Sequence, residues 1–168
     1  EKTDGTATEN CDVQLYYLFG LPATGKSHIG RILQKHFGFQ YYDADEWLPD
    51  DLLDSLKQGN SFTPAQRDRY YSRICDNIDG ILNTNNNTKT PVVVAQATFK
   101  NKHRLKILKR FPYIRFIWIQ TSMGIRLKRL NQRDFKDNNG PVGAELAVGS
   151  KAATVEWCEK NDRLFELP

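Results

Sequence analysis

One run of eight residues has the composition to hold a polyphosphate: residues 20–27 read Gly-Leu-Pro-Ala-Thr-Gly-Lys-Ser. This sequence fits the phosphate-binding loop pattern G-x-x-x-x-G-K-[ST], the P-loop. In such a loop, backbone N–H groups and the N-terminus of the following helix present partial positive charge to phosphate oxygens. Lys26 can reach the β- and γ-phosphates, and the Ser27 hydroxyl can ligate Mg²⁺. The predicted nucleotide-binding residues are Gly20, Leu21, Pro22, Ala23, Thr24, Gly25, Lys26, Ser27 and His28.

Two carboxylates could supply a metal ligand and a general base. Asp43 and Asp45 follow a short predicted strand at residues 39–42. Many P-loop NTPases hold Mg²⁺ with an Asp at the end of another apolar strand, but here the best such strand, residues 91–95, is followed by Gln96. We therefore predict Asp43 as the metal-side partner of Ser27, and Asp45 as the residue that binds the phosphate acceptor and takes its proton. The alternative is that both acids only mark a solvated strand end.

The segments around the P-loop have the periodicities that its chemistry needs. Residues 13–19 are apolar and aromatic-rich, which predicts a buried strand before the loop. After the loop, apolar residues recur at helical spacing up to Phe37, and Gly38 stands where a helix cap would fall. A chance match on an ordinary Gly/Pro turn would not require a strand before it and a helix after it.

Further along the chain, strand and helix patterns alternate. We expect four further helices: one from Pro49 to near Gly59, one from Thr63-Pro64 through Leu82, one that ends at about Phe111 and one that begins at Ser122. Strands are expected at residues 91–95 and 113–119, and a polar, asparagine-rich loop at residues 83–90. This alternation predicts a parallel sheet covered on both faces by helices, an α/β fold. Ligands of such sheets bind beyond the carboxyl ends of the strands. The P-loop, Asp43/Asp45, Gln96/Thr98 and Thr121 all fall at such ends.

Composition limits the class of protein. The chain has 168 residues, 39% hydrophobic and 26% charged, which is typical of one globular domain. There is no apolar run of membrane-spanning length and no signal-peptide core. Its three cysteines are widely spaced, so we expect reduced thiols and a cytoplasmic protein.

Positive charge is concentrated between residues 100 and 133, where Lys and Arg recur and no acidic residue occurs. Three interpretations stay open: a nucleic-acid surface, a set of phosphate ligands in a cleft, and the solvated faces of two helices.

Over about residues 15–133, the chain resembles gluconokinase-type small carbohydrate kinases, within the shikimate-kinase-like and nucleoside-monophosphate-kinase-like P-loop group. Residues 20–30, GLPATGKSHIG, are similar to that family's P-loop, and residues 42–45, YDAD, to its strand-end D-G-D. Arg67 matches the arginine of its G-x-P-L-T-D-x-D-R segment. Residues 94–104, VAQATFKNKHR, resemble V-A-C-S-A-L-K-x-x-Y-R, and residues 129–133 resemble its R-L-x-x-R.

The resemblance implies a three-layer α/β/α P-loop NTPase fold and ATP-dependent phosphorylation of a hydroxyl on a small molecule, a sugar acid such as gluconate, with ATP and Mg²⁺ as cofactors. Residues 1–12 are polar and small, which predicts a disordered tail. A single kinase domain is then expected at residues 13–168, and the resemblance implies a lid at about 123–150. The implied catalytic residues are Lys26, Asp45, Arg129 and Arg133. The implied acceptor-binding residues are Asp45, Arg67, Lys100 and Arg104, and the implied metal ligands are Ser27 and Asp43. No membrane partner is expected, nucleic acid ranks behind small molecules, and a homodimer stays open.

Two departures from the family pattern leave the acceptor unnamed. The family's acceptor-contacting histidine falls at Leu48, and the aspartate before Arg67 is Gln66. A shikimate- or nucleotide-type kinase remains an alternative, although the D-G-F-P-R and triple-glycine segments of those kinases are absent. A polynucleotide-end kinase would account for the basic segment. A non-catalytic nucleotide-binding module would account for Leu48 and Gln66.

Overall fold

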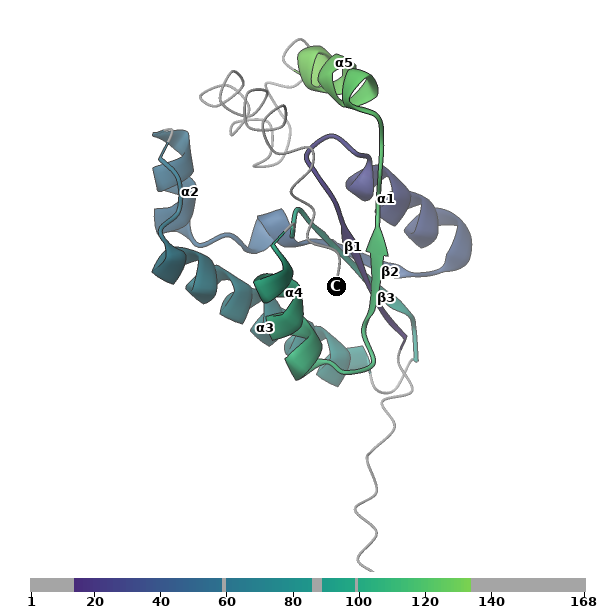
Figure 1. Ribbon diagram of the computed structural model, residues 1–168. Coiled ribbons are helices and arrows are strands. Elements are labelled where there is room, and N and C mark those ends of the chain that lie inside the picture. The colour runs from purple at the N-terminus through teal and green to yellow at the C-terminus, as the bar shows by residue number, and fades with distance from the viewer. Residues whose placement is uncertain (1–13, 59, 86–88, 99, 134–168) are drawn as a thin grey trace, which may run out of the picture.

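The computed structural model describes residues 14–58, 60–85, 89–98 and 100–133. Its core is a parallel four-stranded sheet in the order β2-β3-β1-β4 (Figure 1). The strands are β1 (Leu15–Phe19), β2 (Gln40–Asp43), β3 (Val92–Gln96) and β4 (Arg115–Trp118). In register, Phe19 lies opposite Gln96 and Asp43 opposite Ala95, so the functional strand ends meet at one edge. The α/β P-loop fold class is confirmed.

Helices cover both faces of this sheet, as the alternating pattern predicts (Figure 1). One face packs on α1 (Lys26–Phe37), where Ile29 and Leu33 contact Leu18, Val93 and Ala95. The other face packs on α3 (Pro64–Asn85) and α4 (Asn101–Arg110), with a larger core of buried side chains that includes Tyr17, Phe19, Val92, Val94, Ile74, Ile78 and Ile107. The 3-10 helix η1 (Ala44–Trp47), α2 (Asp50–Lys57) and α5 (Met123–Arg133) complete the described elements.

The predicted loop at residues 83–90 begins too early, because α3 continues to Asn85. Asn85 is buried and exchanges two hydrogen bonds with Gln40, of 2.8 and 2.7 Å, so tertiary contacts hold the last turn of the helix. The start of α3 carries a reciprocal cap, in which Gln66 Oε1 accepts from Thr63 N–H and Thr63 Oγ1 accepts from Gln66 N–H, at 2.8 and 3.2 Å. Gln66 therefore has a structural task of its own at this position.

Two predicted segments, the N-terminal tail at residues 1–12 and the part of the lid beyond residue 133, lie outside the described residues. The single-domain boundary stays a prediction. Among the described residues, no helix is long and apolar enough to cross a membrane.

Candidate active site

Tight backbone turns give the P-loop its shape. Gly20 has a φ of 153°, and a Cβ there would lie 2.4 Å from the Ile119 carbonyl oxygen after β4. Gly25, with a φ of 104°, turns the chain into α1. The Thr24 hydroxyl donates to the Leu21 carbonyl at 2.9 Å and ties the loop across itself. Glycine is needed at both turns because a side chain would be strained in either conformation.

The Lys26 ammonium lies across this loop. Its Nζ donates to the carbonyl oxygens of Gly20 and Leu21, at 3.1 and 3.0 Å. The charge is thus held at the mouth of the loop, in reach of whatever the loop binds.

Ser27 and Asp43, the two predicted metal ligands, are in direct contact. Ser27 Oγ donates to Asp43 Oδ2 at 3.0 Å, and the Tyr41 hydroxyl donates to the same oxygen at 3.1 Å. Burial raises the pKa of Tyr41, so its hydroxyl keeps the proton that it donates. A hydroxyl and a carboxylate are hard oxygen ligands that suit Mg²⁺, which commonly takes one or two protein ligands together with phosphates and waters. Among the described residues, no group of three or more His, Cys, Asp or Glu side chains is placed to hold a metal ion.

Asp45 is positioned by η1 and by the end of β3. Its backbone N–H donates to Asp43 Oδ1 at 3.2 Å, which caps η1. Its Oδ1 accepts from Gln96 Nε2 at 3.1 Å. The Tyr70 hydroxyl donates to the Ala44 carbonyl at 2.6 Å and thereby attaches α3 to the same turn. Burial, and then the charge of Asp45, raise the pKa of Tyr70, so a neutral phenol faces the carboxylate.

Sequence reasoning missed the aromatic wall around Asp45. Tyr17, Tyr70 and Tyr71 are buried on the α3 side of the sheet, and burial raises the pKa of each, that of Tyr71 to about 12. The two adjacent tyrosines of α3 could have indicated this cluster, but adjacent aromatic residues in a helix are equally typical of the hydrophobic core.

The predicted basic residues occupy different environments. Arg129 Nη1 donates to the P-loop carbonyls of Ala23 and Thr24, both at 3.1 Å, so it is joined to the loop. Arg104 is buried, lies 4.9 Å over the Phe19 ring and donates to the Thr98 carbonyl at 3.1 Å. Arg67 donates to the Phe62 carbonyl at 3.3 Å, and Lys100 is exposed before α4. The side chain of Arg133 lies outside the described part of the chain.

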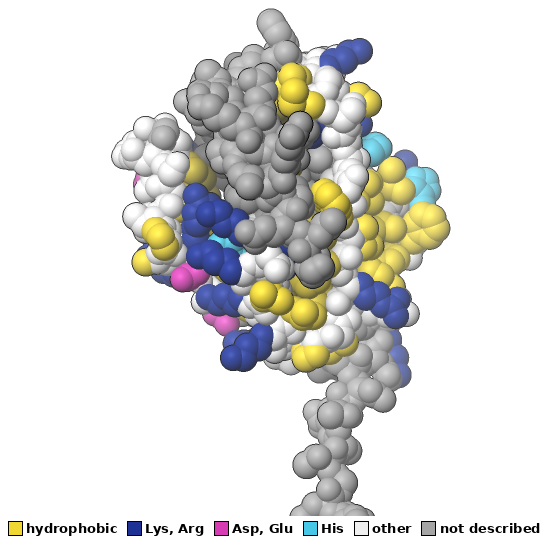
Figure 2. Space-filling model, viewed as in Figure 1, with side chains coloured by type: hydrophobic (Ala, Val, Ile, Leu, Met, Phe, Trp, Pro, Cys, Tyr) yellow, Lys and Arg dark blue, Asp and Glu magenta, His cyan; other side chains and the backbone are white. Residues whose placement is uncertain are grey.

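Part of the basic segment ties α4 to α3. Arg110 pairs with Asp79, and Lys106 Nζ donates to the Asp68 carbonyl at 2.8 Å and to Ser72 Oγ at 2.9 Å. On the face drawn in Figure 2, Lys and Arg side chains lie in several separate groups. These contacts favour the interpretation of this stretch as helix faces over a continuous nucleic-acid surface.

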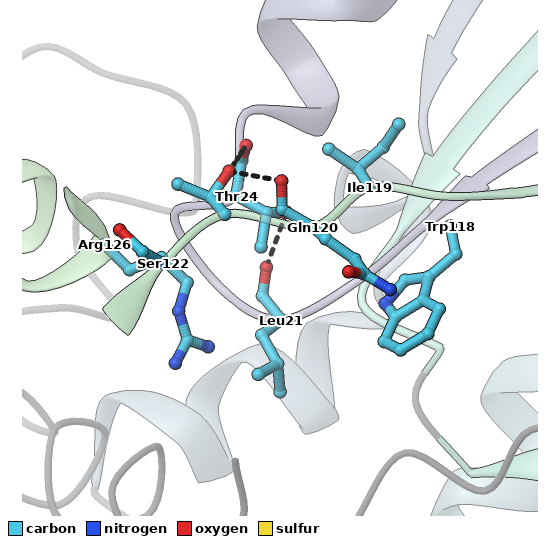
Figure 3. A pocket seen from close by; sticks show the side chains of 8 residues that line it. Leu21, Thr24, Trp118, Ile119, Gln120, Ser122 and Arg126 are labelled. Atoms are coloured by element: carbon cyan, nitrogen blue, oxygen red, sulfur yellow. Dashed lines mark hydrogen bonds between the residues drawn. The ribbon is translucent and has the colours of Figure 1, made fainter. Parts of the chain in front are cut away.

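A pocket of about 430 Å³ adjoins the P-loop between the end of β4 and α5 (Figure 3). The Thr121 hydroxyl donates to the Thr24 carbonyl at 2.9 Å and closes one side of it. Arg126, which sequence reasoning did not single out as a site residue, is buried and extends from α5 on the same side of the loop as Leu21 (Figure 3). The lining residues are Leu21, Thr24, Trp118, Ile119, Gln120, Thr121, Ser122 and Arg126.

A parallel sheet whose first strand leads through a P-loop into a helix defines a P-loop NTPase fold. The chain belongs to the AAA domain family, whose model matches residues 17–145. No curated protein gives a significant sequence match.

Solved structures with the same fold include small-molecule kinases. A sugar kinase from Janibacter sp. HTCC2649 has a TM-score of 0.63 at 15% identity, over 85% of this chain and 78% of that chain. A gluconokinase from Sinorhizobium meliloti 1021 has a TM-score of 0.60 at 17% identity, over 84% of this chain and 74% of that chain. An APS kinase from Mycobacterium tuberculosis, in complex with AMPPNP and APS, has a TM-score of 0.50 at 19% identity, over 74% of this chain and 69% of that chain. The fold expected from the resemblance to small carbohydrate kinases is thereby confirmed.

Proposed function

We propose that the protein is a cytoplasmic phosphotransferase that moves the γ-phosphoryl group of ATP to a hydroxyl of a small polar metabolite. A sugar acid such as gluconate is the first candidate acceptor. The observation that carries the proposal is the arrangement of two carboxylates beside the P-loop. Asp43 contacts Ser27 at 3.0 Å, and Asp45 is held next to it by Gln96. The shared fold of a sugar kinase and a gluconokinase supports this choice of acceptor class.

In the proposed reaction, the loop N–H groups and Lys26 bind the ATP phosphates, while Ser27 and Asp43 hold Mg²⁺. When bound, the metal neutralises charge on the phosphates. Asp45 takes the proton of the acceptor hydroxyl as its oxygen forms a bond to the γ-phosphorus, and the bond from that phosphorus to the leaving ADP oxygen breaks. Arg129 and Arg133 stabilise charge on the transferred group. Arg67, Lys100 and Arg104 act on the acceptor side.

Acceptor-dependent ADP release tests the proposal. A coupled assay over sugar acids, sugars, polyols, shikimate, nucleotides and 5′-hydroxyl oligonucleotides is expected to show stimulation by one class of small acceptor. If ATP binds but every acceptor leaves the basal rate unchanged, the chain is a nucleotide-binding module. If only oligonucleotides stimulate, with a steep salt dependence, it is a polynucleotide-end kinase. Light scattering of the same sample decides whether it is a homodimer.

Asp45→Asn tests the catalytic assignment. Removal of a general base is expected to lower kcat by about 10²- to 10⁴-fold, while the affinity for ATP, measured with a fluorescent analogue, stays near normal. Glu46→Gln is the matched control, because Glu46 is exposed in the same turn of η1. Turnover in Asp45→Asn equal to that of the control would remove Asp45 from the role of base.

A further inference from the structure

The side chain of Gln96 is buried at the end of β3 and is hydrogen-bonded through both ends of its amide. Nε2 donates to Asp45 Oδ1 at 3.1 Å and to the Tyr70 hydroxyl at 3.4 Å, while Oε1 accepts from Thr98 Oγ1 at 3.2 Å. The reverse orientation of the amide would set its carbonyl oxygen against the Asp45 carboxylate. The Asp45 contact therefore fixes which end of the amide carries the donor.

Each hydrogen bond of this network has a defined donor and acceptor. Thr98 has a single hydroxyl proton, which goes to Gln96, so the contact of 2.9 Å between Tyr17 and Thr98 has Tyr17 as donor. Tyr70 gives its proton to the Ala44 carbonyl at 2.6 Å and so accepts from Gln96. Burial raises the pKa of Tyr17 and Tyr70, which keeps both donors protonated. The chain of donors from Tyr17 through Thr98 and Gln96 ends on Asp45 Oδ1.

We propose that Gln96 is a positioning residue for phosphoryl transfer, whose amide holds Asp45 as a hydrogen-bond acceptor and fixes the rotation of its carboxylate toward the acceptor hydroxyl. The proposal rests on the proposed function. An amide suits this place better than a carboxylate, because a carboxylate has no N–H to donate to Asp45. The amide thus holds the Asp45 carboxylate through its donor while its own oxygen accepts from Thr98.

Three substitutions at this position test the role of the donor. Gln96→Leu removes the donor and is expected to lower kcat by about ten- to a hundred-fold, with the KM for ATP unchanged. Gln96→Asn keeps the amide on a shorter side chain and is expected to fall between Gln96→Leu and the wild type. Gln96→Glu keeps the size but replaces the N–H donor with an acceptor, and is expected to lower kcat at least as far as Gln96→Leu. Gln34→Glu, on the exposed side of α1, makes the same replacement and is expected to leave kcat unchanged.

The contact between Gln96 and Asp45 can be followed without turnover, by the side-chain amide resonances of Gln96, assigned with Gln96→Leu. Asp45→Ala removes the acceptor, and we expect it to shift these resonances at a fixed pH, because the donor at 3.1 Å loses its partner. Glu46→Gln, at an exposed position of η1, is expected to leave them unchanged.

Two results would overturn the proposal: Gln96 amide resonances that are the same in Asp45→Ala and in the wild type, or a wild-type kcat in a folded Gln96→Leu variant. Thermal unfolding checks the fold of each variant, and Gln96→Asn provides the kcat comparison if Gln96→Leu does not fold. A wild-type protein that transfers to no acceptor refutes the proposed function instead. In that case the amide resonances still decide whether Gln96 holds Asp45, so the two failures are distinguishable.

Discussion

Gly30 controls how closely α1 approaches β2, and its replacement by alanine tests the geometry behind the proposed metal site. A Cβ at Gly30 would lie 2.2 Å from Cε2 and 2.3 Å from Cδ2 of the Tyr41 ring. The ring cannot bend and its hydroxyl donates to Asp43 Oδ2 at 3.1 Å. The ring must therefore rotate away, and that rotation breaks its contact with the carboxylate that faces Ser27.

Three effects set the size of the change. Overpacking of this kind costs about 1–3 kcal/mol, and the lost hydrogen bond adds about 1 kcal/mol. The higher helix propensity of alanine returns about 1 kcal/mol. We expect Gly30→Ala to lower the free energy of unfolding by about 2 kcal/mol, and Tm by about 4–8 °C for a chain of this size.

Gly80→Ala is the matched control. Gly80 lies within α3, and no atom lies within 4 Å of its ideal Cβ. This variant is expected to gain about 0.5–1 kcal/mol, so the two Gly→Ala changes should move Tm in opposite directions. Circular dichroism melts and urea unfolding measure both. If Gly30→Ala were as stable as Gly80→Ala, or if Gly30→Ala cost as much in a Tyr41→Leu background, the ring contact would not be the cause.

Three further outcomes follow from the structure. Gly20→Ala forces a Cβ to within 2.4 Å of the Ile119 carbonyl and should weaken ATP binding, measured by fluorescence titration, by about ten-fold or more; unchanged binding would contradict the loop geometry. Burial lowers the pKa of His103 to about 4, below its usual value near 6.5, so the unfolded chain takes up this proton first. Stability should therefore fall as the pH drops from about 6.5 to about 4, by at most about 1.4 kcal/mol per pH unit. Urea unfolding of His103→Phe, which keeps the stacking on Tyr71, should lack this component. Burial raises the pKa of the Cys75 thiol, so in a Cys11→Ser/Cys158→Ser background it should react with a disulfide reagent only after unfolding; fast labelling of the native protein would show that this thiol is exposed.

The sequence predicts the elements well where a local pattern decides them. The apolar run at residues 91–95 forms most of β3, and the apolar residues at helical spacing after the P-loop belong to α1, with Gly38 as its left-handed cap at φ 70°. The Thr63/Gln66 cap is also visible in the local sequence, as a Thr followed three residues later by a Gln.

Contacts between distant segments account for what the sequence could not predict. Gln96 and Asp45 form a hydrogen bond although they are 51 residues apart in the sequence, and nothing local in either segment indicates this contact. Arg126 is among the largest fully buried side chains, yet an arginine in a basic helix is ordinarily exposed, so only the three-dimensional packing of α5 reveals it. The hydrogen bond between Gln40 and Asn85 could not be predicted either. The asparagine-rich run that begins near Asn85 predicts a loop, and only the contact with Gln40 shows that the helix continues to this residue.

The strand alternation explains why the proposed metal carboxylate can come from β2 instead of β3. Val93 and Ala95 point to the α1 side of the sheet, so a β3 carboxylate facing Ser27 would have to stand at residue 95. Ala95 is small, and Asp43, its partner in register, lies on the neighbouring strand and reaches Ser27 at 3.0 Å. Gln96 alternates to the opposite side, where α3 brings Tyr70, and there it contacts Asp45. An acid at residue 96 would therefore lie on the proposed acceptor side and not on the proposed metal side.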